Sequence, residues 1–158
     1  MKKSDLLIII PAYNEEENIE NVVNFIQENY SQYDYIVVND GSIDRTAEIC
    51  REKGYELLNL PVNLGLAGAF QTGLKYAYEK DYSFAIQFDA DGQHLPEFIE
   101  PMLKRIREGY DIVIGSRFVR KRKNNSLRMI GSKVLTVAIK MTTKVRISDP
   151  TSGMRMFS

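Results

Sequence analysis

Short apolar runs recur along the chain at intervals that each leave room for one helix. The first, Leu6–Ile10, is apolar throughout, which is typical of a strand covered on both faces. The expected strands are Leu6–Ile10, Tyr35–Val38, Tyr55–Leu60, Phe84–Phe88 and Asp111–Ile114. Because the connections between them are short, we expect right-handed parallel crossovers. This pattern predicts an α/β fold with an open, mostly parallel sheet and helices on both faces.

Helical spacing between these runs predicts four helices. The first has Ile19, Val22, Val23 and Ile26 on one face, and the second is capped by Asp44 and ends at Gly54. The others are Leu66–Tyr78, whose Ala and Gly content predicts close packing, and a helix that Pro96 opens and that reaches Arg107. Cys50 falls inside the second helical pattern, so we expect a buried core residue rather than a nucleophile.

The 158 residues make one domain, and the single cysteine excludes a disulfide framework. We see no signal peptide and no stretch near the ~20 apolar residues of a membrane span. The net charge of zero hides an asymmetry, because residues 117–146 hold ten basic residues and no acidic one. This asymmetry predicts anionic partners at one end of the domain, the alternative being a solvated loop at Arg120–Lys123.

Asp89 and Asp91 directly follow the fourth expected strand. Two carboxylates so close at the end of a buried strand, with no nearby basic residue, are costly unless a cation neutralises them. Oxygen ligands suit Mg²⁺ or Mn²⁺. A calcium loop is excluded, because Gly92 stands at position four instead of six and the flanks predict a strand followed by a loop. A structural carboxylate turn remains the alternative, and we interpret His94 as a loop residue that hydrogen-bonds its neighbours.

Polar clusters follow each expected strand. They are Pro11–Glu15, Asn39–Ser42, Asn63–Gly65, Asp89–Asp91 and Gly115–Arg117. Because ligands bind at the carboxyl ends of the strands in such sheets, we expect these clusters to converge on one site. The chain has neither a Gly-x-Gly-x-x-Gly nor a Walker motif, so a bound diphosphate would need a metal for charge neutralisation.

These segments resemble the successive signatures of glycosyltransferase family 2, over essentially the whole chain. Within the family the chain is most similar to the dolichol- or polyprenyl-phosphate sugar synthases, through Asp89–His94 and Ser148–Gly153. The resemblance implies a GT-A fold and inverting transfer of a hexosyl group from a UDP- or GDP-linked sugar, with Mg²⁺ or Mn²⁺ bridging the diphosphate. It further implies a polyprenyl phosphate acceptor, a part in cell-envelope polysaccharide synthesis, and a cytoplasmic location at the inner face of the membrane.

The resemblance also implies residue roles. The nucleotide would be bound by Pro11, Tyr13, Glu15, Asp40, Gly65 and Asp89, and the metal by Asp89, Asp91 and Gln93. The acceptor phosphate would be bound by Arg117, Arg128 and Ser132, and catalysis would involve Asp91, Asp149 and Arg117.

Several of these residues have a structural alternative. Tyr13 is equally a candidate core aromatic, and Glu15 complements a helix N-terminus. Gly65 is also typical of an ordinary turn. Arg128 fits a surface position at a helix start, and Asp149 a turn or cap.

The resemblance divides the chain into a nucleotide-sugar part, residues 1–116, and a basic acceptor-side segment, residues 117–158. We interpret the ending as that of a domain cut from a longer polypeptide. Helical spacing over 130–141 predicts an amphipathic helix that contacts a membrane surface or packs on the body. Two alternative functions stay open: transfer to a glycan hydroxyl with Asp149 as general base, and a module that only binds nucleotide and metal. We expect no nucleic-acid partner.

Overall fold

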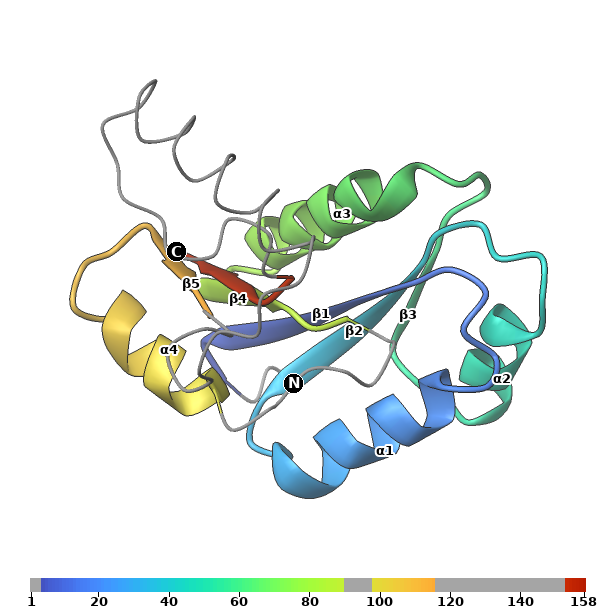
Figure 1. Cartoon of the computed structure of the whole chain (residues 1–158), viewed down its shortest axis with the longest axis horizontal. Coiled ribbons are helices and arrows are strands. Elements are labelled where there is room, and N and C mark those ends of the chain that lie inside the picture. Colours follow the sequence, from blue (N-terminus) through green and yellow to red (C-terminus); the bar gives the residue numbers. More distant parts are fainter. Residues whose placement is uncertain (1–3, 90–97, 116–152) are drawn as a thin grey trace, which may run out of the picture.

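The computed structural model describes residues 4–89, 98–115 and 153–158, which form a sheet with helices on both faces (Figure 1). Within these residues six strands lie in the order β3-β2-β1-β4-β6-β5. They are β1 Leu6–Ala12, β2 Asp34–Asn39, β3 Leu57–Asn59, β4 Phe84–Gln87, β5 Ile112–Ile114 and β6 Arg155–Phe157. The helices are α1 Ile19–Asn29, α2 Thr46–Glu52, α3 Gly65–Glu79 and α4 Ile99–Ile106. The expected α/β class is confirmed.

The first four strands are parallel, as expected. β1 pairs in parallel with β2 and β4, and β2 pairs in parallel with β3. All seven residues of β1 are buried, which is why this run is apolar throughout. The third strand is shorter than expected, although the Val37 N–Glu56 O and Leu60 N–Asn39 O bonds, both 2.9 Å long, extend its pairing on either side.

The last strand, β6, was not predicted from the sequence. β6 lies between β4 and β5 and pairs antiparallel with both. Met156 of β6 is fully buried, so this short strand fills the gap between the two. Because two antiparallel pairings restore the direction, β5 runs the same way as β4 and places Gly115 at the same sheet edge.

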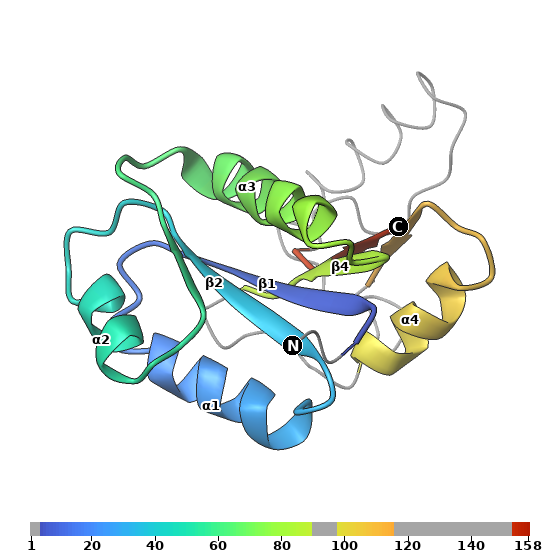
Figure 2. The same ribbon diagram turned by 180° about the vertical axis from the view of Figure 1, so that it is seen from behind.

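The two faces of the sheet carry different helices. α1, α2 and α4 cover one face, where Leu6, Ile8 and Ile10 of β1 point into the larger core cluster (Figure 1). α3 alone covers the described part of the opposite face, over Leu7 and Ile9 (Figure 2). Burial of both faces is the main favourable contribution to folding.

Close packing of α3 is confirmed at Gly73, where an added Cβ would overlap Cγ2 of Ile9. The end of α2 also agrees with expectation: Gly54 has φ +68°, and Tyr55 N donates to Cys50 O at 2.9 Å. Cys50 itself is fully buried in the larger core cluster, as expected. Among the residues that the structure describes, no helix is both long and apolar enough to cross a membrane.

Candidate functional site

The loops that follow β1, β2 and β3 are joined by hydrogen bonds at one edge of the sheet. Asp40 N donates to Ala12 O at 2.8 Å, which ties the end of β2 to the end of β1. Leu64 N donates to Asp40 Oδ1 at 2.7 Å, which ties the loop before α3 to the same point. Three of the predicted polar clusters therefore converge as expected, because parallel strands bring their carboxyl ends together.

Asp40 is the most buried carboxylate of this edge, with 2% of its surface exposed. Its Oδ1 is occupied by Leu64 N. Among the described residues no hydrogen bond reaches its Oδ2. A buried carboxylate oxygen without a donor is costly, so this atom favours a ligand that offers an N–H or O–H group.

Tyr13 lies beside this point and is 45% exposed, so the alternative that it is a core aromatic is wrong. Pro11, in contrast, is buried within β1 and pairs with Val38. Of these two predicted nucleotide ligands, Tyr13 alone offers a side chain at the surface.

Glu15 is held at the beginning of α1. Its backbone carbonyl accepts bonds from Asn18 N at 3.0 Å and Ile19 N at 2.8 Å. Its carboxylate accepts a bond from Asn18 Nδ2 at 2.9 Å. These contacts hold Glu15 in the turn that leads into α1, and its side chain is half-buried, so both roles for Glu15 remain predictions.

Gly65 begins α3 with φ +75°, a conformation that favours glycine, and Asn63 Oδ1 accepts its N–H at 3.0 Å. An added Cβ would meet no atom within 4 Å. The backbone is therefore open on this side, which fits both a turn glycine and close approach of a ligand.

Asp89 ends the described part of the fourth strand segment. Gln87, which is 4% exposed, donates from Nε2 to Asp89 Oδ1 at 2.7 Å. The other two predicted metal ligands, Asp91 and Gln93, lie outside the described residues, as does His94. Within the described ranges no group of three acidic, His or Cys side chains could hold a metal, so a site here depends on those partners. Their oxygen donors are the kind that Mg²⁺ and Mn²⁺ take.

Sequence reasoning missed a hydrogen-bonded bridge between the β1–α1 and β2–α2 loops. Three side chains, Ser42, Asp44 and Thr46, form what we call the loop bridge, because each accepts a bond from the β1–α1 loop. The donors are three consecutive backbone N–H groups, those of residues 14–16. The hydrogen bonds are Asn14 N to Ser42 Oγ at 3.0 Å, Glu15 N to Thr46 Oγ1 at 2.8 Å and Glu16 N to Asp44 Oδ2 at 3.1 Å. The Ser-x-Asp-x-Thr spacing of residues 42–46 was the one feature of the sequence that could have indicated this bridge.

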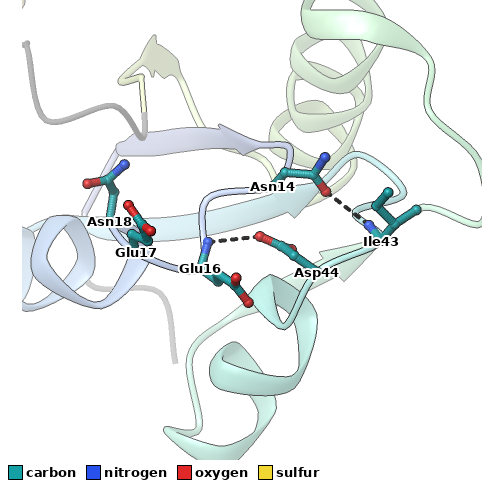
Figure 3. Close-up of a pocket in the computed structure, with 6 residues that line it drawn as sticks. All are labelled: Asn14, Glu16, Glu17, Asn18, Ile43 and Asp44. Atoms are coloured by element: carbon teal, nitrogen blue, oxygen red, sulfur yellow. Dashed lines mark hydrogen bonds between the residues drawn. The ribbon is translucent and has the colours of Figure 1, made fainter.

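Two bonds run in the opposite direction across the same bridge. Ile43 N donates to Asn14 Oδ1 and Arg45 N donates to Glu16 Oε2, each at 3.0 Å. Figure 3 shows the Asn14–Ile43 and Glu16–Asp44 contacts. The outer side of the bridge is a hollow of about 430 Å³ lined by Asn14, Glu16, Glu17, Asn18, Ile43 and Asp44.

The N-cap of α2 is Arg45 and not Asp44 as expected, although Asp44 Oδ1 accepts a bond from the N–H of Thr46, the first residue of the helix, at 3.0 Å. Burial by itself raises the pKa of Asp44, but the bonds from Thr46 and Glu16 outweigh it and hold the pKa below its usual value. Asp44 therefore accepts these bonds as an ionised carboxylate.

The predicted acceptor residues lie outside the described residues. They are Arg117, Arg128 and Ser132, and the predicted catalytic residue Asp149 lies there too. The helix expected over 130–141 and Pro96, the expected first residue of the fourth helix, also lie there. Their roles remain predictions.

Comparisons with known proteins agree with this arrangement. A family model described as glycosyl transferase family 2 matches residues 7–158. The UDP-N-acetylglucosamine–dolichyl-phosphate N-acetylglucosaminyltransferase of Methanococcus voltae is 36% identical over 174 residues, which cover 97% of this chain and 69% of that protein. The polyprenol monophosphomannose synthase of Mycolicibacterium smegmatis is 31% identical over 160 residues, covering 96% of this chain and 60% of that protein.

A crystal structure supports the fold assignment. Glucosyl-3-phosphoglycerate synthase from Mycobacterium tuberculosis, in complex with Mn²⁺, uridine-diphosphate-glucose and phosphoglyceric acid, matches with a TM-score of 0.73 and 21% identity. The match covers 97% of this chain and 56% of that one, and it confirms the expected GT-A fold. The chain spans 60 to 69% of the length of the two curated relatives above.

Proposed function

Since the chain belongs to glycosyltransferase family 2, we propose that it transfers a sugar from a nucleotide-diphospho-sugar to a polyprenyl phosphate. We further propose that the transfer depends on a divalent metal and inverts the anomeric configuration. In such a displacement the acceptor oxygen bonds to the anomeric carbon while the bond to the diphosphate oxygen breaks on the opposite side.

The buried Asp40 carboxylate carries the donor part of the proposal. Its Oδ2 lies at the strand-end edge without a donor from the described residues, and the exposed Tyr13 stands on the adjoining loop. A nucleobase offers an N–H edge for the carboxylate and a flat face for the aromatic ring. The structural neighbour with the same fold was crystallised with uridine-diphosphate-glucose, which supports a nucleotide-sugar as the donor.

The proposed metal ligands are Asp89, Asp91 and Gln93. A bound Mg²⁺ or Mn²⁺ would stabilise the negative charge that develops on the leaving diphosphate, as a Lewis acid. The Mn²⁺ in the neighbour's complex supports this choice of ion. Within the protein, the bond from Gln87 Nε2 orients Asp89 at the end of its strand.

The relatives' names support the proposed acceptor, since one acts on dolichyl phosphate and the other is named for polyprenol monophosphomannose. A phosphate monoester is largely ionised near neutral pH, with a second pKa of about 6, so it needs cations more than a general base. Arg117 and Arg128 would supply them, with Ser132 as a hydrogen-bond donor. Because this acceptor is a membrane lipid, we place the reaction at the inner face of the cell membrane.

The first test is binding of uridine or guanosine diphosphate to the chain, with and without Mn²⁺, by calorimetry and thermal unfolding. We expect one nucleotide to bind and to raise the melting temperature only when Mn²⁺ is present. Asp91→Asn should abolish the rise in melting temperature that nucleotide and Mn²⁺ produce together. Substitution of the exposed Asp111 with asparagine should leave that rise unchanged. If neither nucleotide binds with the metal, the proposed donor chemistry is wrong.

A further inference from the structure

We propose that the loop bridge of Ser42, Asp44 and Thr46 positions the segment Tyr13–Glu15 for donor binding. This inference rests on the proposed function, because it assigns these residues to the nucleotide site without contact to the ligand. They are positioning residues, which act through the loop that carries Tyr13. Substitution should therefore weaken nucleotide binding and leave the chemical step unchanged.

The first support is that the bridge engages consecutive peptide units. The N–H groups of Asn14, Glu15 and Glu16 each meet a different acceptor side chain, from the β2–α2 loop or from Thr46 at the start of α2. The partners are 28 to 31 residues away in sequence. Three consecutive N–H groups bound in this way leave the loop little freedom to change its backbone angles.

Hydrogen bonds hold the residues that flank Tyr13 in the sequence. Ala12 O, on its N-terminal side, accepts the bond from Asp40 N at 2.8 Å. Asn14, on its C-terminal side, has φ +56° and contacts the β2–α2 loop through both its N–H and its Oδ1. These two bonds hold Asn14 in its left-handed conformation and so fix the backbone on the C-terminal side of Tyr13. The bridge thus restrains the loop backbone that carries the exposed Tyr13 side chain.

Thr46 is the central residue of the bridge. Its side chain is fully buried, and its Oγ1–H donates to Asp44 Oδ1 at 2.6 Å. A hydroxyl has one proton, so donation to Asp44 leaves a lone pair of Oγ1 free to accept Glu15 N–H at 2.8 Å. Asp44 therefore orients Thr46, and Thr46 in turn holds Glu15. Figure 3 shows Asp44 between the two loops, pointing toward Glu16.

The pair Thr46→Val and Thr46→Ser tests the positioning role. Valine keeps the shape and removes Oγ1, whereas serine keeps the hydroxyl. We expect Thr46→Val to weaken binding of the nucleoside diphosphate and Mn²⁺ about fivefold, the equivalent of one hydrogen bond. Thr46→Ser should stay within about twofold of the unmodified chain. In a transfer assay, Thr46→Val should raise KM for the donor and leave kcat unchanged.

Tyr33→Phe is the matched control, because it also removes one partly buried hydrogen bond, from Tyr33 Oη to Glu100 Oε1 at 2.6 Å. Tyr33 precedes β2 at the opposite edge of the sheet from Asp40. This variant should lose stability without losing nucleotide affinity. A second readout is amide hydrogen exchange without nucleotide, where Glu15 N–H should exchange faster in Thr46→Val and at the normal rate in Tyr33→Phe.

Each outcome decides between the proposals. If the unmodified chain binds nucleotide and a folded Thr46→Val binds it equally well, the positioning role is wrong and the proposed function stands. If the unmodified chain binds no nucleotide, the proposed function fails and the positioning role fails with it. Should Thr46→Val not fold, Ser42→Ala removes the acceptor of Asn14 N–H and is held to the same fivefold expectation.

Discussion

The backbone N–H of Leu64 donates to the carboxylate of Asp40, with 2.7 Å between nitrogen and Oδ1. This bond joins the end of β2 to the loop that begins α3, although the two residues are 24 positions apart in sequence. At Gly41, which follows Asp40, there is no space for a side chain, because an added Cβ would lie 2.7 Å from Asn63 N. The two loops are therefore packed against each other at the point where we expect the nucleotide.

Replacing Asp40 with alanine should lower the free energy of unfolding by about 1–3 kcal/mol, because the partly buried Leu64 N–H loses its acceptor. Asp40→Asn should cost less, since its amide oxygen can still accept this bond. Both variants should bind nucleoside diphosphate more weakly. Alanine lacks Oδ2, the atom proposed to accept the nucleobase N–H, and asparagine puts an NH₂ donor in its place. Denaturant unfolding and calorimetry measure the two effects. Equal stability of Asp40→Ala and the exposed control Asp111→Asn would contradict the prediction.

Replacing Gly73 with alanine should destabilise the fold by about 1–3 kcal/mol, because the new methyl group would overlap Ile9 Cγ2 and force α3 away from the sheet. The matched control is the same substitution in an Ile9→Ala background, where the space is available. There the cost of Gly73→Ala should fall, and a double-mutant cycle of unfolding free energies measures the difference. Additive costs would show that the helix does not depend on this contact.

Cys50 should resist thiol reagents in the native protein. Its side chain is fully buried, and burial raises its pKa to about 11. At pH 8 we expect the single cysteine to be labelled only after denaturation. Rapid labelling of the folded chain would contradict the structure.

The same pKa shift predicts the pH dependence of stability. The folded pKa lies above the value of about 8.5 for an exposed thiol. The contribution of Cys50 to the free energy of unfolding is thus complete below pH ~8.5 and is lost as the pH rises toward about 11. Thermal unfolding of Cys50→Ala should show a smaller alkaline loss of stability over this window than the unmodified chain.

Arg128→Ala distinguishes the two acceptor classes. If a lipid phosphate accepts the sugar, this substitution should reduce transfer by about tenfold or more while donor affinity is kept, because a charge-assisted contact is lost. Arg105→Ala, which removes an exposed arginine paired with Glu108, is the control and should leave transfer unchanged. Transfer that survives Arg128→Ala but is lost in Asp149→Asn would favour a hydroxyl acceptor and a general base.

Much of the fold could be predicted from local patterns. The continuous apolar run of β1 indicates a strand that is buried on both faces. The helical spacing of Ile19, Val22 and Ile26 indicates a helix that is buried on one face. The positions of Asp40 and Gly65 at strand and helix ends followed from the same pattern. β6 was missed because three residues are too few to show a period.

The sequence by itself determined which elements form and which polar clusters stand at their ends. The tertiary structure alone decided how those clusters are held: which Asp40 oxygen meets Leu64, and which side chains meet the N–H groups of residues 14–16. The physical reason is that a hydrogen bond needs its atoms within about 3 Å. Loops 24 to 31 residues apart reach that distance only after the parallel strands have aligned their carboxyl ends.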